Sequence, residues 1–99
     1  MTKPLEGLRI LDLTIIIAGP AATRVLAQLG AEVIKIEAPW GRPASAGYTN
    51  APRQYNSVPS FNEVNRAKLS ISLDLQTYEG RDVLKRLVEI SDVLVQNFS

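Results

Sequence analysis

The stretch RILDLTIIIAGPAATRVLAQLGAEVIKIE, residues 9–37, decides the fold, because it places a strand, a turn, a helix and a second strand in direct succession. Residues 8–13 are rich in Leu and Ile and predict a β-strand. We predict Gly19 as the N-cap of the helix and Pro20 as its first residue, where a missing N–H costs nothing. A turn from a strand into a helix is where α/β proteins often bind a ligand.

The helix after this turn is predicted over residues 21–29, because its apolar residues follow the i, i+3, i+4, i+7 spacing of a buried helical face. Gly30 suits the C′ position that ends such a helix. Residues 31–37 are rich in β-branched side chains and alternate in part, which predicts a second strand. These elements form a βαβ unit with parallel strands and a right-handed crossover.

The next segment, residues 38–59, has neither a helical nor a strand period, and we predict a long loop there. Residues 61–68 predict a short helix or a turn. Residues 69–75 alternate between apolar and polar side chains, which predicts a strand with one face in water. The residues expected on its apolar face are Leu69, Ile71, Leu73 and Leu75.

A second helix is predicted from an N-cap at Thr77 to about Ile90. Glu79 in its first turn suits the helix dipole, and Asp82 and Arg86 have the spacing of a favourable ion pair. The side chains expected to face the core are Val83, Leu84, Leu87, Val88 and Ile90.

A last strand over residues 92–98 completes the order β-α-β, long loop, β-α-β. We therefore predict one α/β domain, a Rossmann-like three-layer parallel sheet. A doubly wound domain normally continues with another helix, whereas this chain ends at residue 99, so the sheet is expected to be truncated and the chain to be a fragment. A truncated sheet exposes apolar surface, and we expect it to associate as a dimer or a higher oligomer.

The composition narrows the chemistry that the chain can perform. A net charge of +1 gives no field that would favour nucleic acid or an anionic membrane. The sequence has no cysteine and no histidine, which removes thiolate catalysis, the commonest general base and the commonest metal ligands, and we expect no metal site. The apolar runs are far too short to span a membrane, no signal peptide is visible, and we expect a cytoplasmic protein.

Three places could bind a ligand, and each has a plain structural alternative. The helix start at Gly19-Pro20 could hold an anion with free backbone N–H groups, or it could simply begin a helix. The sequence has no GxGxxG motif, so a dinucleotide site is not supported. Arg66 and Lys68 could bind phosphate, or they could form a solvated basic turn.

The third place is Asn97-Phe98, at the end of the last strand, which could offer an amide and an aromatic face to a ligand. The alternative is that Phe98 belongs to the core and Asn97 to a turn. Asp12 also lies at a strand end, and we expect it to be a buried carboxylate that caps a neighbouring turn rather than a catalytic base.

Four segments in order resemble the N-terminal segment of the family III CoA-transferases, the CaiB/BaiF type. The family includes formyl-CoA transferase and carnitine CoA-transferase, with α-methylacyl-CoA racemase as a relative. The resemblance covers nearly the whole chain apart from the predicted loop. The segments are PLEGLRILDLT, AGPAATRVLAQLGAEVIKIE, FNEVNRAKLSISLDLQTYEG and LVEISDVLVQNF.

The resemblance implies that residues 1–99 are the N-terminal part of a Rossmann-like large domain, in an interlocked homodimer. It implies that coenzyme A or acyl-CoA is a substrate lying across the carboxyl edge of the sheet, with no covalently bound cofactor. The family transfers CoA from an acyl-CoA to a carboxylic acid through an aspartyl-CoA thioester and mixed anhydrides, which is nucleophilic catalysis by a carboxylate.

The resemblance also implies a set of CoA-contacting residues. The segment that contains Arg66 and Lys68 matches the border of the CoA nucleotide, and Leu73 matches a position whose backbone faces the adenine. Asn97 and Phe98 match the pair that lines the CoA channel. The Gly19-Pro20 turn matches the AGP sequence near the active centre of the family.

Some positions depart from the family pattern. Ile17 stands where transferases can have a polar residue, and Ala38 and Gln76 stand where a basic residue is often found. Arg42 or Arg53 could compensate for the missing cations.

The nucleophilic aspartate of the family matches no Asp here, so we expect no catalytic residue in this chain. Two alternatives stay open: a non-enzymatic, oligomerising module without a ligand, and a fragment of an acyl-CoA racemase-type isomerase.

Overall fold

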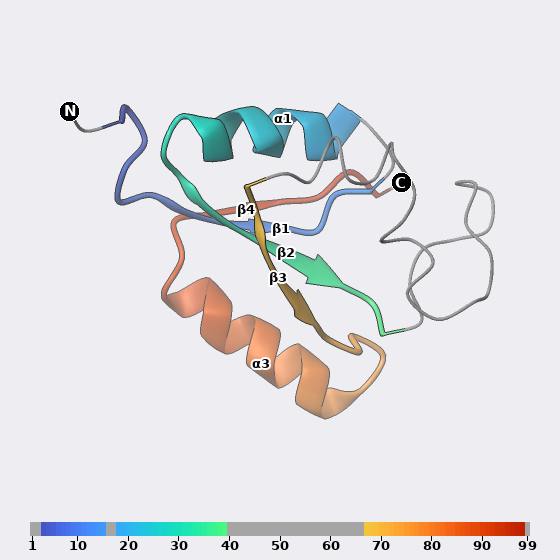
Figure 1. The fold of residues 1–99 in the computed structure, drawn as a ribbon. Coiled ribbons are helices and arrows are strands. Elements are labelled where there is room, and N and C mark those ends of the chain that lie inside the picture. The colour runs from blue at the N-terminus through green and yellow to red at the C-terminus, as the bar shows by residue number, and fades with distance from the viewer. Residues whose placement is uncertain (1–2, 16–17, 40–66, 99) are drawn as a thin grey trace.

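The computed structural model describes residues 3–15, 18–39 and 67–98 of the chain, which form a parallel sheet between two helices (Figure 1). The strands are β1 (Arg9–Asp12), β2 (Glu32–Glu37), β3 (Leu69–Ser72) and β4 (Val93–Val95), and they lie in the order β3-β2-β1-β4. The helices are α1 (Ala18–Gln28) and α3 (Tyr78–Glu89), which cover opposite faces of the sheet. The predicted α/β class and three-layer arrangement are confirmed.

The first βαβ unit follows the prediction except at the start of its helix. The structure begins α1 at Ala18, so Gly19 and Pro20 lie inside the first turn and the predicted N-cap at Gly19 is wrong. Pro20 is still tolerated there, because the first N–H groups of a helix have no partner within it. The predicted end is confirmed: Gly30 has φ +110°, and its N–H bonds the Ala27 carbonyl at 3.0 Å.

The second unit is shorter in its strands than the sequence predicts. β3 ends at Ser72, although the Leu73 N–H still bonds the Glu37 carbonyl at 2.9 Å. Thr77 is the N-cap of α3, as predicted, and accepts a hydrogen bond of 3.0 Å from the Gly80 N–H. The predicted loop and the short helix or turn before Ala67 fall almost entirely outside the described residues.

Two apolar clusters form the core, one on each face of the sheet. Beneath α1, Ile10 and Val33 pack with Ala27 and Ala31. On the α3 face, the buried residues Leu11, Leu13 and Ile36 pack against partly buried leucines of α3 and of the segment after β3. Those partly buried leucines are Leu73, Leu75, Leu84 and Leu87.

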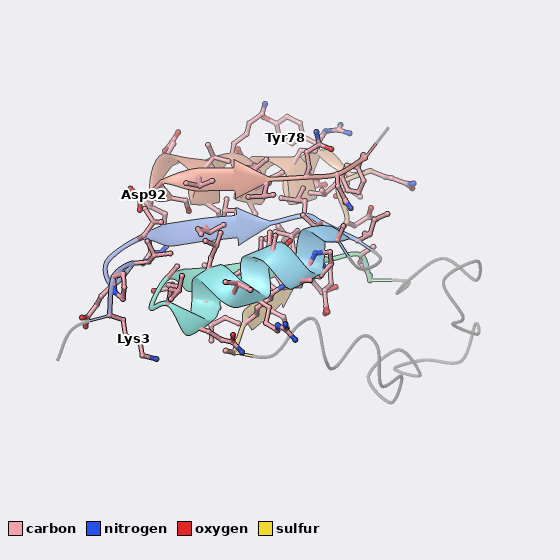
Figure 2. The ribbon with its side chains drawn as sticks, turned by 90° about the horizontal axis from the view of Figure 1, so that it is seen from above. Lys3, Tyr78 and Asp92 are labelled. Carbon is pink, nitrogen blue, oxygen red and sulfur yellow. The ribbon has the colours of Figure 1, made fainter. Side chains whose placement is uncertain are left out.

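Several side chains predicted to face the core are exposed instead. Leu69 is 58% exposed at the start of edge strand β3, and Ile90 is 61% exposed at the C-terminal end of α3. Figure 2, seen from the side of α1, shows β4 lying beside that helix rather than beneath it, with Asp92 at the start of the strand. β4 is the other edge strand, and α1 does not lie over it. Val83 and Val88 of α3, which were also predicted to face the core, are exposed as well, and so are Val93 and Leu94 of β4.

None of the helices in the described ranges has the length and apolar character needed to cross a membrane.

Candidate functional site

The candidate site lies at the carboxyl edge of the sheet, where β1 and β4 end side by side. β1 leads into α1 on one face, whereas β4 follows α3 on the other face (Figure 1). The strand order therefore reverses direction between β1 and β4, and this edge is the topological switch point of the sheet. Open α/β sheets bind ligands in the crevice at such a point.

Asn97 links the two chain segments that leave this switch point. Its Oδ1 accepts a hydrogen bond of 2.9 Å from the Ile15 N–H, and its Nδ2 donates one of 3.0 Å to the Ile15 carbonyl. The last backbone bond between the two segments runs from the Leu13 N–H to the Val95 carbonyl at 2.9 Å. The Asn97 amide therefore continues the β1–β4 ladder beyond the point where the backbones separate.

Position 19 requires glycine, because the first turn of α1 packs very closely against the end of β1. A Cβ atom on Gly19 would lie 2.5 Å from the Thr14 Cβ and 3.2 Å from the Asn97 Nδ2. No real side chain tolerates the first of these distances, so the first turn of α1 can pack against the end of β1 only with glycine here. The AGP sequence is thus explained by packing between the helix start and the residues after β1.

A buried ion pair lies beneath this turn. Lys68 Nζ and Asp12 Oδ2 are 2.7 Å apart, and the two side chains are 1% and 0% exposed. Lys68 Nζ also donates to the Pro20 carbonyl at 3.0 Å. The Thr23 hydroxyl donates to Asp12 Oδ2 at 2.7 Å, and the Thr14 N–H donates to Asp12 Oδ1 at 2.8 Å. The expectation that Asp12 is a buried carboxylate capping a turn is confirmed.

The environment of Asp12 keeps its carboxylate ionised. Burial alone acts to raise the pKa of Asp12, but the hydrogen bonds from Lys68, Thr14 and Thr23 and the charge of Lys35 act in the other direction. The outcome is a pKa below the ordinary value of 3.8. Lys35, itself 3% exposed, donates to the Thr14 carbonyl, so a second cation supports the segment after β1.

The structure brings four of the predicted site residues together. Gly19 and Pro20 are in the first turn of α1, Asn97 contacts the segment after β1, and Lys68 reaches the same turn from below. Phe98 follows Asn97 and is 52% exposed, so the alternative that places it in the core is wrong.

The other two predicted site residues are placed differently. Leu73 follows β3, two strands away from β1, with its N–H bonded to Glu37 and its side chain against the α3-face core. Arg66 lies outside the described residues. In the described ranges, no three acidic side chains gather in a way that could hold a metal ion.

Sequence reasoning missed the polar partners of Asp12. The signal was present, because Lys35 interrupts the apolar strand EVIKIE as Asp12 interrupts RILDLT. A parallel strand covered on both faces is normally apolar throughout, so a charge within it indicates a buried partner. No sequence motif around Lys35 or Thr23 identifies either residue as a partner of Asp12, because only the fold brings them together.

Comparison with known proteins gives one consistent result. The model of CoA-transferase family III matches residues 5–99. A formyl-CoA:oxalate CoA-transferase of Streptomyces avermitilis is 44% identical over 100 residues, which cover 99% of this chain and 24% of that protein. A mouse succinyl-CoA:glutarate CoA-transferase is 44% identical over 104 residues, covering 97% of this chain and 22% of that protein.

Solved structures agree with these sequence comparisons. The crystal structure of a hypothetical protein from Mycobacterium tuberculosis matches with a TM-score of 0.81 and 42% identity, over 97% of this chain and 25% of that one. A CaiB/BaiF family protein from Brucella suis matches with a TM-score of 0.78 and 34% identity, over 99% of this chain and 26% of that one. The chain spans about a quarter of the length of the curated relatives it matches.

Proposed function

Because this chain belongs to CoA-transferase family III, we propose that it is the N-terminal, CoA-binding part of such an enzyme, with coenzyme A or acyl-CoA as its substrate and no covalently bound cofactor. The observation that carries the proposal is the arrangement at the switch point. Asn97 bridges to Ile15 there, and the exposed Phe98 follows it directly. A cytoplasmic location and a place within a larger family domain are part of the same proposal.

In this proposal, CoA lies across the ends of β1 and β4. Phe98 presents an aromatic face to the ligand, because half of its surface is exposed at the switch point. Asn97 keeps hydrogen-bonding capacity beyond its two bonds to Ile15, since an amide offers two donor hydrogens and two acceptor lone pairs. The first turn of α1 contributes the positive end of a helix dipole on the same side.

The phosphate-binding assignment divides between the two predicted cations. The Lys68 ammonium is held 2.7 Å from a carboxylate and is buried, so a phosphate would have to compete with Asp12 for it. We therefore keep Arg66 as the candidate for contact with the nucleotide phosphates and give Lys68 a supporting part. The backbone of Leu73 remains the candidate neighbour of the adenine.

We further propose that this chain alone does not transfer CoA. None of the four aspartates of the sequence matches the nucleophile that the family resemblance implies, and in the structure each contacts a cation or a backbone N–H. Their partners are Lys68 for Asp12, the Gln76 N–H for Asp74, Arg86 for Asp82 and the Arg9 N–H for Asp92. Turnover of an acyl-CoA with a carboxylate acceptor by the purified chain would contradict this part of the proposal.

Calorimetric titration with CoA and with dephospho-CoA tests the binding proposal. We expect CoA to bind and the missing 3′-phosphate to weaken binding by about tenfold, the loss of one charge-assisted contact. Phe98→Ala is expected to raise the Kd for CoA by about tenfold. Ile90→Ala is the matched control, because Ile90 is also an exposed apolar residue but precedes β4 at the opposite edge.

The two outcomes of that titration separate the alternatives. Binding that Phe98→Ala weakens and Ile90→Ala leaves unchanged supports the CoA-binding assignment. No binding of CoA at millimolar concentration would favour the folded module without a ligand. The racemase-type isomerase shares acyl-CoA as its ligand, so this experiment does not separate it from the transferase.

Self-association is the last part of the proposal, and a homo-oligomer is its expected form. The support is the apolar surface of edge strand β4, where Val93 is 40% exposed and Leu94 is 44% exposed. Light scattering at increasing concentration is expected to give a mass at or above that of a dimer. A monomer at high concentration would contradict the proposal.

A further inference from the structure

Lys68 connects elements that the sheet keeps apart. It directly precedes β3, and β2 lies between β3 and β1. Its side chain nevertheless reaches Asp12, the last residue of β1, and the Pro20 carbonyl in the first turn of α1. One ammonium group therefore joins the start of β3, the end of β1 and the start of α1.

The backbone just before Lys68 is unusual. Ala67 has a φ of 65°, which lies in the left-handed region that residues other than glycine rarely adopt. Strained backbone of this kind persists where the surrounding structure holds it, and it gathers at functional sites. Here it directly precedes the lysine whose ammonium is buried.

The bonds around Asp12 lead from Lys68 to the candidate site. Asp12 Oδ2 accepts a hydrogen bond from the Lys68 ammonium, and Asp12 Oδ1 accepts one of 2.8 Å from the Thr14 N–H. The Thr14 side chain is the group that a Cβ on Gly19 would strike, so the position of Thr14 sets how closely α1 approaches. The next residue, Ile15, holds the Asn97 amide through both of its backbone groups.

A buried ion pair is a poor way to gain stability alone, because the cost of removing two charges from water offsets much of their attraction. Apolar packing continues on the same face of the sheet, where Ile10 and Val33 close the core with hydrocarbon. The ion pair adds a defined geometry, because Lys68 Nζ donates hydrogen bonds to two particular atoms, Asp12 Oδ2 and the Pro20 carbonyl oxygen.

We propose that Lys68 is a positioning residue, whose buried ammonium holds the first turn of α1 against the end of β1 and so sets the geometry in which Asn97 and Phe98 meet CoA. The role for CoA rests on the proposed function. Lys68 does not touch the ligand; it acts through Asp12, Thr14 and the Pro20 carbonyl.

The test compares Lys68→Met with Val33→Ala. Val33 is 1% exposed on the same face of the sheet but lies in the apolar cluster, so its truncation loosens the core without touching the ion pair. For each variant we would measure global stability, the Kd for CoA while the protein is folded, and hydrogen exchange at the Ile15 amide. Lys68→Met is expected to raise the Kd by about tenfold and to speed Ile15 exchange by about tenfold.

Val33→Ala is expected to lose stability while its Kd for CoA stays within about twofold of the wild-type value, because the turn keeps its bonds. A purely structural role for Lys68 predicts that Kd and Ile15 exchange follow global stability in both variants alike, and that result would overturn the proposal. Unchanged CoA affinity in Lys68→Met would overturn it as well.

The double variant Asp12→Asn with Lys68→Met keeps the test decisive if Lys68→Met does not fold. It removes the ion pair as a whole, so it is expected to be more stable than either single variant. Positioning predicts that its affinity for CoA and its Ile15 protection stay low although stability recovers. Recovery of all three would overturn the proposal.

The failure of the proposed function is visible separately. If the wild-type protein does not bind CoA, the CoA-binding proposal fails and the ligand role of Lys68 fails with it. Ile15 exchange then still decides whether Lys68 holds the turn, because that measurement needs no ligand.

Discussion

Under the C-terminal half of α1 the sheet is packed with hydrocarbon, whereas under its N-terminal half the sheet is packed with charge. Ile10, Val33 and Ala27 fill the first region, and Asp12, Lys68 and their partners fill the second. Both regions are dry, and both lie on one face of the same strands. The change from one to the other takes place within β1, between Ile10 and Asp12.

The difference shows how one sheet serves two purposes. Apolar side chains gain free energy from burial, about 1.5 to 3 kcal/mol each, and many arrangements of similar volume would serve. The charged region gains little from burial, but its bonds select one arrangement of the first turn of α1 and the segment after β1. The charged region lies at the carboxyl edge of the sheet, where the candidate site is.

The largest effect is expected from breaking the charged region at its centre. Asp12→Asn leaves the Lys68 ammonium buried without its carboxylate, and we expect a loss of about 3 to 5 kcal/mol in the free energy of unfolding. Urea unfolding followed by circular dichroism measures it. A chain that is unfolded without urea would agree with the expectation, and a loss below about 1 kcal/mol would show that the ion pair is replaceable.

The charged region should also make stability depend on pH. The pKa of Asp12 lies below 3.8 in the folded protein and returns to about that value on unfolding, so the unfolded chain binds the proton more readily. The contribution of Asp12 is therefore complete above pH 3.8 and is lost as the pH falls through the lower, folded pKa.

Urea unfolding between pH 6 and pH 2 checks this dependence by comparing the wild type with Asp12→Asn. The wild type should lose stability more steeply at the acid end, because the variant lacks the titrating carboxylate. Parallel curves for the two proteins would mean that Asp12 does not carry the effect.

Much of the apolar region was predictable from the sequence, and little of the charged one was. The spacing of apolar residues and Gly30 predicted the first βαβ unit, because periodicity reports which side faces the core. Thr77 predicted the start of α3 from a local bond. The ion pair joins residues 56 positions apart, and no local pattern links Asp12 to Lys68.

The errors have related causes. Gly19 suits an N-cap by its chemistry, but a close contact with Thr14 decides its place inside the first turn. Leu69 and Ile90 have the periodicity of buried residues, yet both are exposed, since Leu69 begins edge strand β3 and Ile90 lies at the C-terminal end of α3, just before edge strand β4. Periodicity shows which face is apolar, but it does not show what covers that face.

Gly19→Ala tests the contact between the two segments that the charged region holds together. The added methyl group would lie 2.5 Å from the Thr14 Cβ, so either the helix start or the segment after β1 must move. Overpacking of this kind typically costs about 1 to 3 kcal/mol, and we expect a loss of stability in that range. Gly7→Ala is not a suitable control, because Gly7 has a φ of +94° and would add backbone strain.

Ala22→Gly is a better control, because Ala22 is an exposed residue of the same helix. Its expected cost of about 1 kcal/mol comes from helix propensity alone. Ile15 exchange should rise in Gly19→Ala and stay unchanged in Ala22→Gly. Equal exchange in the two variants would show that the close contact does not transmit to Asn97.

A smaller effect is expected within the apolar region. Ile10→Val removes one methylene from a side chain that is 1% exposed, and we expect a loss of about 1 kcal/mol at any pH between 3 and 7. Its pH profile should therefore run parallel to that of the wild type, in contrast to Asp12→Asn. A profile that diverges at acid pH would mean that the two regions are coupled through β1.

The smallest effect is expected at the exposed ion pair on α3. Comparing this pair with the buried pair of Asp12 and Lys68 separates the effect of charge in water from that of charge in the core. Asp82 and Arg86 are 3.1 Å apart, close to the separation of the buried pair, but the Arg86 side chain is 77% exposed. Water already solvates both groups, so Asp82→Ala should change the free energy of unfolding by about 0.3 to 0.5 kcal/mol, and less at high salt. Urea unfolding at low salt and at 1 M salt measures both the loss of stability and its dependence on salt. A loss as large as that of Asp12→Asn would show that the distance between the charges, rather than their burial, sets the cost, and the difference between the two regions under α1 would then need another cause.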